Sequence, residues 1–133
     1  MKRCLPMIVL IISLVLPVAA LAADQVPPGF IAISDGKMTY YDAKKFCEDK
    51  GGRLPYVGGG SAALKKTPKG TSIEVFGTVG SQWPASVPKA DYWTGTDNAS
   101  GPRSGYVITT SRLGVDAMGS HRSGEARTLC IAK

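Results

Sequence analysis

The sequence predicts a single α+β domain with a mostly antiparallel sheet, and three observations lead to this fold class. One short amphipathic helix is expected to begin at Thr39 and to carry Cys47 on its buried face. A long stretch rich in glycine and proline follows, and β-prone runs then fill the chain from Tyr92 to its end. A helix followed by loops and consecutive strands is the element order of an α+β domain.

Residues 1–23 are expected to be a secretory signal peptide. Met1-Lys2-Arg3 is a basic start, an apolar run from Leu5 to Val18 follows, and Ala20-Leu21-Ala22 is a small-residue cleavage box. The rival interpretation is an uncleaved membrane anchor, but the run is shorter than the ~20 residues that a span needs. We therefore expect residues 24–133 to form one mature domain that is periplasmic or secreted from a bacterial cell, with no membrane span once the leader is removed.

The charge of the mature domain is mildly basic. The whole chain has a formal net charge of +6, and removal of Lys2 with Arg3 leaves 14 basic against 10 acidic residues, or +4. Such a balance favours acidic partners such as an anionic polysaccharide, and it falls short of what a nucleic-acid-binding protein needs.

The first half of the mature chain has clear local signals. Phe30–Ile33 is predicted to be a strand, ended by the turn residues Ser34-Asp35-Gly36. Thr39 is the expected helix N-cap, and Gly51-Gly52 is the expected helix exit, because glycine readily adopts positive φ there.

The second half is predicted to be a loop region followed by strands. Residues 56–90 are expected to be mostly irregular, with one or two helical turns at 61–66, a short strand at 73–76 and a long loop at 77–88. Turn residues fill 97–102, and 119–125 is expected to be a polar loop. The predicted strands of the last third are 92–96, 106–110, 113–118 and 126–132.

Two cysteines lie outside the leader, and in an exported protein they predict one disulfide, Cys47–Cys130. The alternative is a pair of free thiols or a redox pair, but the 83-residue separation is not the CxxC spacing of redox motifs. The bond would tie the end of the chain to the helix.

Several motifs together resemble C-type-lectin-like domains, closest to the bacterial branch that includes the C-terminal domain of collagen-like adhesins. The similar segments are the helix pattern from Thr39 to Cys47, its exit Arg53-Leu54-Pro55, the segment Tyr92-Trp93-Thr94-Gly95-Thr96 and the closing strand with Cys130. The resemblance implies a twisted antiparallel sheet whose N- and C-terminal strands lie together, with a long loop region that carries the ligand contacts.

The chain departs from the calcium-binding members of that family. The tripeptides that supply their calcium ligands are missing, and Asp97-Asn98 is the only acidic and amide pair near the corresponding place, whereas calcium takes six to eight oxygens. We therefore expect no metal and no cofactor.

Candidate ligand-binding residues come from side-chain chemistry. Trp83 lies in a loop rich in proline and glycine, where an exposed ring could stack on a sugar, and guanidinium groups suit sulfate, carboxylate or phosphate. If the turns at 97–103 and 119–125 meet at one end of the sheet, their arginines form a basic patch; the alternative is scattered, solvated charge. The candidate set is Trp83, Arg103, Arg112, His121 and Arg122.

No catalytic constellation is evident in the sequence. His121 is the only histidine, and no nucleophile and orienting acid accompany it in a recognisable motif. The expectation is therefore a non-catalytic binding module for an anionic glycan or a cell-surface ligand, without a metal. The alternative is a periplasmic inhibitor, immunity or accessory protein that binds a protein partner through the glycine-rich loop.

Overall fold

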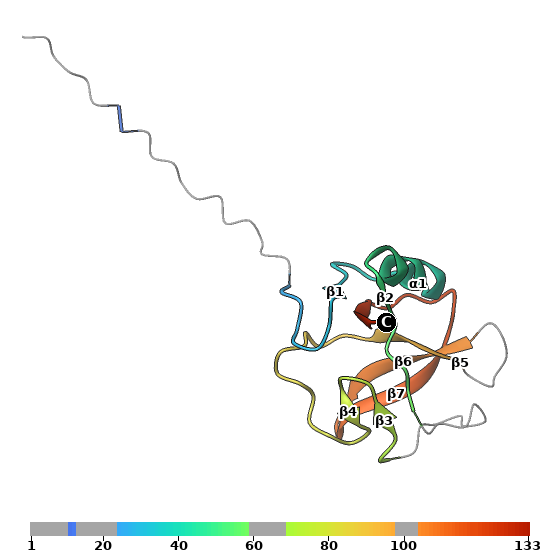
Figure 1. The fold of residues 1–133 in the computed structure, drawn as a ribbon. Helices are drawn as coiled ribbons and strands as arrows, with labels where there is room; N and C mark the ends of the chain where they lie inside the picture. The colour runs from blue at the N-terminus through green and yellow to red at the C-terminus, as the bar shows by residue number, and fades with distance from the viewer. Residues whose placement is uncertain (1–10, 13–23, 59–68, 98–103) are drawn as a thin grey trace, which may run out of the picture.

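The structure, a computed structural model, describes residues 11–12, 24–58, 69–97 and 104–133. Figure 1 shows the arrangement of its elements. They are β1 (Ala32–Ile33), α1 (Tyr40–Asp49), β2 (Gly52–Arg53), β3 (Ser72–Ile73), β4 (Gly77–Thr78), β5 (Tyr92–Asp97), β6 (Ser104–Ser111), β7 (Gly114–His121) and β8 (Leu129–Ala132). In the described part of the chain, no helix combines the length and the hydrophobicity that a membrane crossing requires.

The predicted helix is confirmed. The Thr39 side chain accepts a hydrogen bond from the Asp42 amide, and Tyr40, Ala43 and Cys47 form the buried face. At the other end the Gly51 amide donates to the Glu48 carbonyl, and Gly51 has the left-handed backbone (φ +77°) that ends many helices.

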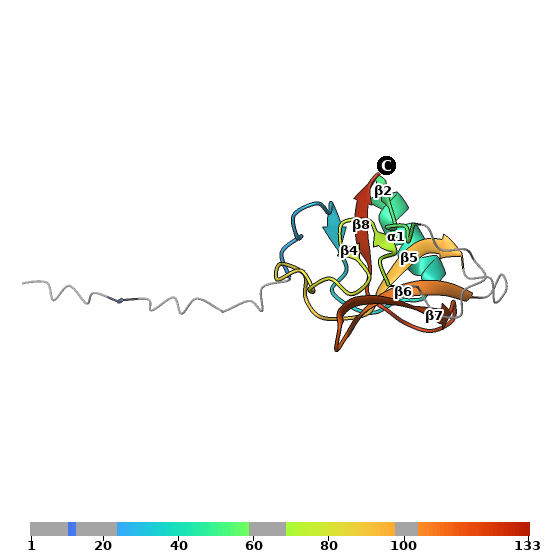
Figure 2. The same cartoon turned by 90° about the horizontal axis from the view of Figure 1, so that it is seen from below.

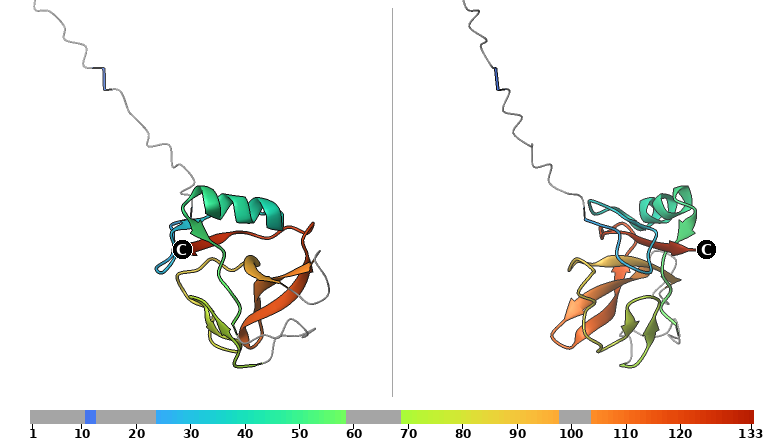
Figure 3. Two further views of the ribbon diagram at one scale, coloured as in Figure 1. Left: turned by 45° about the vertical axis from the view of Figure 1, so that its right-hand side comes forward. Right: turned by 60° about the vertical axis from the view of Figure 1, so that its left-hand side comes forward.

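Strand β8 places the last residues of the chain between two short strands from its first half. It pairs antiparallel with β1 on one side and with β2 on the other, so that Ala32 faces Cys130 and Gly52 faces Ala132. Figure 2 shows β8 between these two short strands. In both views of Figure 3, α1 lies at one end of the molecule next to β8, and the sheet of β5, β6 and β7 lies beyond β8.

The larger sheet is the antiparallel meander β5–β6–β7, as the predicted strands indicated. A bulge or irregularity between Trp93 and Asp97 shifts the register of β5. Strand β7 continues to His121, which pairs with Ser104, so the predicted loop at 119–125 begins later than expected. A parallel bridge between Tyr92 and Arg127 connects the meander to the segment that leads into β8.

The middle of the chain differs most from the prediction. Residues 74–76 are a turn instead of a strand, and they join β3 to β4 in a small hairpin within the region expected to be irregular. Val75 has positive φ (+67°), which a β-branched residue seldom adopts, so local sequence preference did not reveal this turn. The helical turns predicted at 61–66 lie outside the described residues, as do residues 98–102 of the predicted turn at 97–102.

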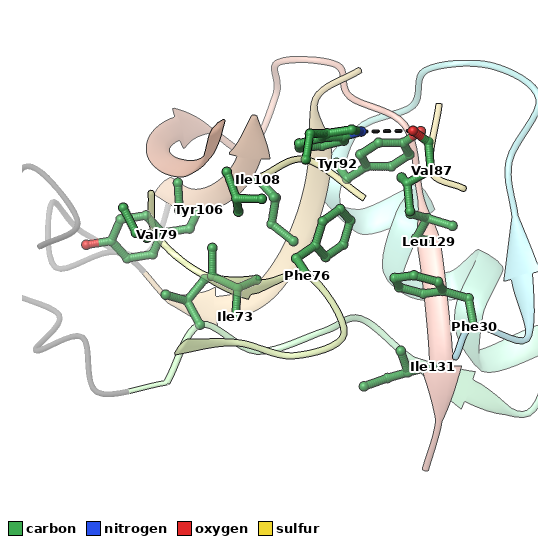
Figure 4. Close-up of a cluster of buried hydrophobic side chains, with 14 residues drawn as sticks. Phe30, Ile73, Phe76, Val79, Val87, Tyr92, Tyr106, Ile108, Leu129 and Ile131 are labelled. Carbon is green, nitrogen blue, oxygen red and sulfur yellow. Dashed lines mark hydrogen bonds between the residues drawn. The ribbon is translucent and has the colours of Figure 1, made fainter. Parts of the chain in front are cut away.

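Two clusters of buried side chains stabilise the domain. The larger cluster lies between the meander, β3–β4 and β8 and includes Phe76, Trp83 and Tyr92 (Figure 4). The smaller one packs α1 against Trp93 and contains the predicted disulfide, which joins Cys47 to Cys130. Both cysteines are completely buried.

Candidate functional site

A basic groove of about 740 Å³ lies between the segment 80–89 and the turn that joins β6 to β7. Its volume falls within the ~300–1,000 Å³ range of ligand sites. The polar side chains that line it are Gln82, Lys89, Thr110, Ser111 and Arg112, and the apolar ones are Trp83, Pro84, Ala85, Val87 and Leu113.

Backbone hydrogen bonds hold the two sides of this basic groove together. The Gly80 amide donates to the Val115 carbonyl at 2.8 Å, and the Val115 amide donates to the Ser81 carbonyl at 2.7 Å. Gly114 lies against Ser81 so closely that a Cβ at this position would overlap the Ser81 carbonyl oxygen. The groove is therefore a preformed feature of the folded backbone.

The expectation that the Trp83 ring is exposed is wrong. The residue is only 9% exposed, and its indole Nε1 donates to the Val87 carbonyl at 2.8 Å, a bond drawn in Figure 4. The ring stacks on Tyr92 with centroids 6.2 Å apart and packs against Phe76. The loop folds back on the core because burial removes the large apolar area of this ring from water. Trp83 contributes only a small surface to the groove wall.

Tyr92, which stacks on Trp83, is completely buried. Its hydroxyl donates to the Pro88 carbonyl at 2.7 Å. Burial raises the pKa of the Tyr92 phenol above its usual value; the Arg127 guanidinium opposes this shift, and Asp24 adds to it. Both aromatic side chains therefore support the groove from below.

The charge of the basic groove is positive. Lys89 and Arg112 are exposed, neither makes an ion pair or a hydrogen bond with any described residue, and no carboxylate is among the lining residues. The stem of Lys69 runs along Gly80, at the border of the groove. Two unpaired cations in a preformed hollow suit an anionic group on a ligand.

The other predicted ligand-binding residues lie elsewhere. Ser111 pairs with Gly114, whereas Ser104 pairs with His121, so the β6–β7 turn with Arg112 and the 121–122 position are at opposite ends of strands β6 and β7. Eight-residue strands span ~25 Å. The predicted residues therefore do not share one site: Trp83 and Arg112 line the basic groove, and His121 and Arg122 line a smaller hollow of about 450 Å³. The strand ends next to the turns 97–103 and 119–125 do lie at the same end of the sheet, as the pairs Asp97–Gly105 and Ser104–His121 show. Arg103 lies outside the described residues.

In that smaller hollow, His121 and Arg122 make local contacts. The His121 Nδ1 lies 2.5 Å from the Ser123 hydroxyl and accepts from the Ser123 amide. Arg122 Nε donates to the Ser104 carbonyl, and its guanidinium lies 4.3 Å from the centre of the Tyr40 ring. Arg122 thus packs against the start of α1, whereas His121 contacts Ser123 in the turn that follows β7. Among the described residues, no group of three or more potential ligands could hold a metal ion.

Lys89 lines the basic groove and was not among the residues predicted from the sequence. Its position after Pro88, in the same loop as Trp83, could have identified it as a candidate ligand-binding residue. The second cation of the groove, Arg112, is 23 positions later in the sequence. Only the pairing of segment 80–81 with β7 brings the two near one groove.

Comparison of the chain with protein-family models, with curated proteins and with solved structures finds no match.

Proposed function

We propose that the mature domain is a non-catalytic binding module that recognises an anionic glycan through the basic groove, without a metal. The observation that supports this proposal is the pair of exposed, unpaired cations Lys89 and Arg112 in a groove without a lining carboxylate. A guanidinium fork and an ammonium group match sulfate or carboxylate substituents, and the neighbouring Gln82 and Thr110 side chains suit sugar hydroxyls.

The test is binding of the oxidised mature domain to heparin, alginate and neutral dextran at low and at physiological salt. We expect salt-sensitive binding to the two anionic polymers only, since exposed charge contacts are screened by salt. The double variant Lys89→Ala/Arg112→Ala should lose about a hundredfold in affinity if each charge-assisted contact contributes ~1.5 kcal/mol. Lys37→Ala/Lys45→Ala removes the same charge from elsewhere and should bind nearly as well as the natural sequence. An equal loss of affinity in both double variants would mean that only the net charge of the domain matters, and it would contradict a specific site in the basic groove.

A second candidate is the inhibitor, immunity or accessory role, and Leu113 favours it. This leucine is 73% exposed at the tip of the β6–β7 turn, next to the basic groove. An exposed apolar side chain next to cations suits a protein partner that offers an apolar pocket with an acidic rim. Under this alternative no polysaccharide binds, and Leu113→Ser abolishes cross-linking to one envelope protein while Met118→Ser, also at an exposed apolar residue, does not.

The proposal includes export and the C-type-lectin-like fold. Its supports are the leader-like start of the sequence, the buried disulfide, and the pairing of β1 with β8 next to α1. The mass of the protein recovered from a bacterial periplasm or culture medium tests cleavage near Ala23, and an uncleaved, membrane-bound product would contradict export.

A further inference from the structure

A second groove, of about 520 Å³, lies between α1 and the chain that follows β2. Strand β2 lies next to the helix in Figure 3, and the chain that follows it leads away from this point. Tyr40, Lys44 and Glu48 line the helical wall at four-residue intervals, so this wall is ~12 Å long. We call it the helix groove; none of its lining residues belongs to the basic groove.

The wall opposite the helix is held in place by Arg53. Its Nη1 donates to Glu74 Oε2 at 2.9 Å and to the Leu54 carbonyl at 3.2 Å, and Nη2 donates to Glu74 Oε1 at 3.4 Å. The guanidinium carbon lies 4.5 Å from the centre of the Tyr56 ring. Because Glu74 neutralises Arg53, this residue acts mainly as a rigid support for the wall.

Tyr56 is an exposed aromatic residue with a fixed position. The residue is 45% exposed, but its ring packs directly on the backbone of Gly95 in β5. A Cβ at this glycine would be only 2.8 Å from Tyr56 Cε1. Held by Arg53 and by Gly95, the side chain has little rotational freedom to lose when a ligand binds.

Several polar side chains of the helix groove are available to hydrogen-bond a ligand. The hydroxyls of Tyr40 and Tyr56 make no hydrogen bond with any described residue, and Lys44 makes no ion pair with Glu48 one helical turn away. Lys133 lines the same groove. The walls thus offer ammonium donors, a carboxylate acceptor and tyrosine hydroxyls that both donate and accept.

We propose that the helix groove binds an uncharged carbohydrate of about two sugar rings. Each sugar hydroxyl donates and accepts hydrogen bonds at the same time, which matches a wall that mixes Lys44, Glu48 and two phenols. The partly apolar edge of a sugar ring fits next to the fixed Tyr56 side chain. The lining mixes both signs of charge, Lys44 and Lys133 with Glu48, and Glu74 neutralises Arg53, which favours a ligand without a strong net charge. This inference does not depend on the function proposed for the basic groove.

The test uses the oxidised mature domain, labelled with ¹⁵N, and three neutral disaccharides: N,N′-diacetylchitobiose, cellobiose and maltose. We expect at least one of them to shift amide resonances at 40–56, 95 and 133 with a dissociation constant of about 1 mM. High salt should leave this binding unchanged, because no net charge is exchanged.

Matched variants on the two sides of α1 control for stability. Lys44→Ala/Glu48→Ala should weaken the binding at least tenfold, whereas Lys45→Ala/Asp49→Ala, one position further along the same helix, should not change it. Tyr56→Phe keeps the ring packing and should weaken binding severalfold. Lys89→Ala/Arg112→Ala should have no effect. The absence of shifts with all three disaccharides, or shifts located elsewhere, would overturn the proposal.

Discussion

At the scale of single residues, two completely buried threonines differ in whether their hydroxyl group makes a hydrogen bond. Thr94 Oγ1 donates to the Tyr106 carbonyl at 2.9 Å, whereas Thr128 Oγ1 has no hydrogen-bond partner among the described residues. A buried polar atom without a partner lowers stability by ~1–3 kcal/mol. The two positions therefore form a natural comparison.

We expect Thr128→Val to raise the free energy of unfolding by about 1 kcal/mol, because it replaces the unpaired hydroxyl with a methyl group of similar size. Thr94→Val should lower it by ~1–2 kcal/mol, because it removes a buried hydrogen bond. Urea denaturation of both variants measures the difference. A loss of stability in Thr128→Val would mean that its hydroxyl is satisfied in solution.

Tyr92 predicts how stability changes at alkaline pH. Burial raises the pKa of its phenol in the folded state, so the folded protein holds the proton more tightly than the unfolded chain. The stabilisation is complete below the unfolded pKa of about 10 and is lost as the pH rises above it. Urea midpoints measured above pH 10 should fall, and they should fall less steeply in Tyr92→Phe. Tyr41→Phe, at a residue that is 63% exposed, should keep the steep fall.

At the scale of elements, the contact between the β6–β7 turn and segment 80–81 shapes the basic groove. Gly114 has φ +99° and lies against the Ser81 carbonyl, whereas Gly51 at the end of α1 has φ +77° and open space where a Cβ would lie. The two glycines have similar backbone geometry and differ in their surroundings.

Gly51→Ala should therefore lower stability by only ~1–2 kcal/mol, the usual effect of a left-handed alanine. Gly114→Ala should lower it by more than ~3 kcal/mol, because the new methyl group forces segment 80–81 away from β7. Thermal unfolding of both variants measures this. Equal effects would show that the Ser81 backbone moves easily, and the groove would then not be rigid.

At the scale of the whole molecule, the disulfide joins α1 to the last strand across 83 positions. A loop of this length predicts that the bond stabilises the fold by roughly 4–5 kcal/mol. That value is comparable with the net stability of a small domain.

The double variant Cys47→Ala/Cys130→Ala should therefore be largely unfolded or should unfold at much lower urea concentrations. Because both cysteines are fully buried, dithiothreitol should reduce the native protein slowly and the urea-unfolded protein rapidly. Quantification of free thiols over time measures both rates. Rapid reduction of the native protein would contradict the buried position of the bond.

The sequence predicted correctly the elements that depend on residues close together in the chain. It also predicted the disulfide, which involves only two residues. Helix α1 follows from the Thr39 cap and the spacing of Tyr40, Ala43 and Cys47, and the meander follows from β-prone runs separated by turn residues. The disulfide follows from the presence of only two cysteines, Cys47 and Cys130, after the predicted leader.

Only the tertiary structure decided which side chains share a surface. Trp83 is buried because its ring stacks on Tyr92, nine positions later, and Lys89 meets Arg112 at one groove because segment 80–81 pairs with β7. The helix groove needs Gly95 of β5 next to Tyr56. The local conformational preferences of a segment do not predict such pairings. A side chain is buried or exposed according to the free energy of packing against residues that are distant in the sequence.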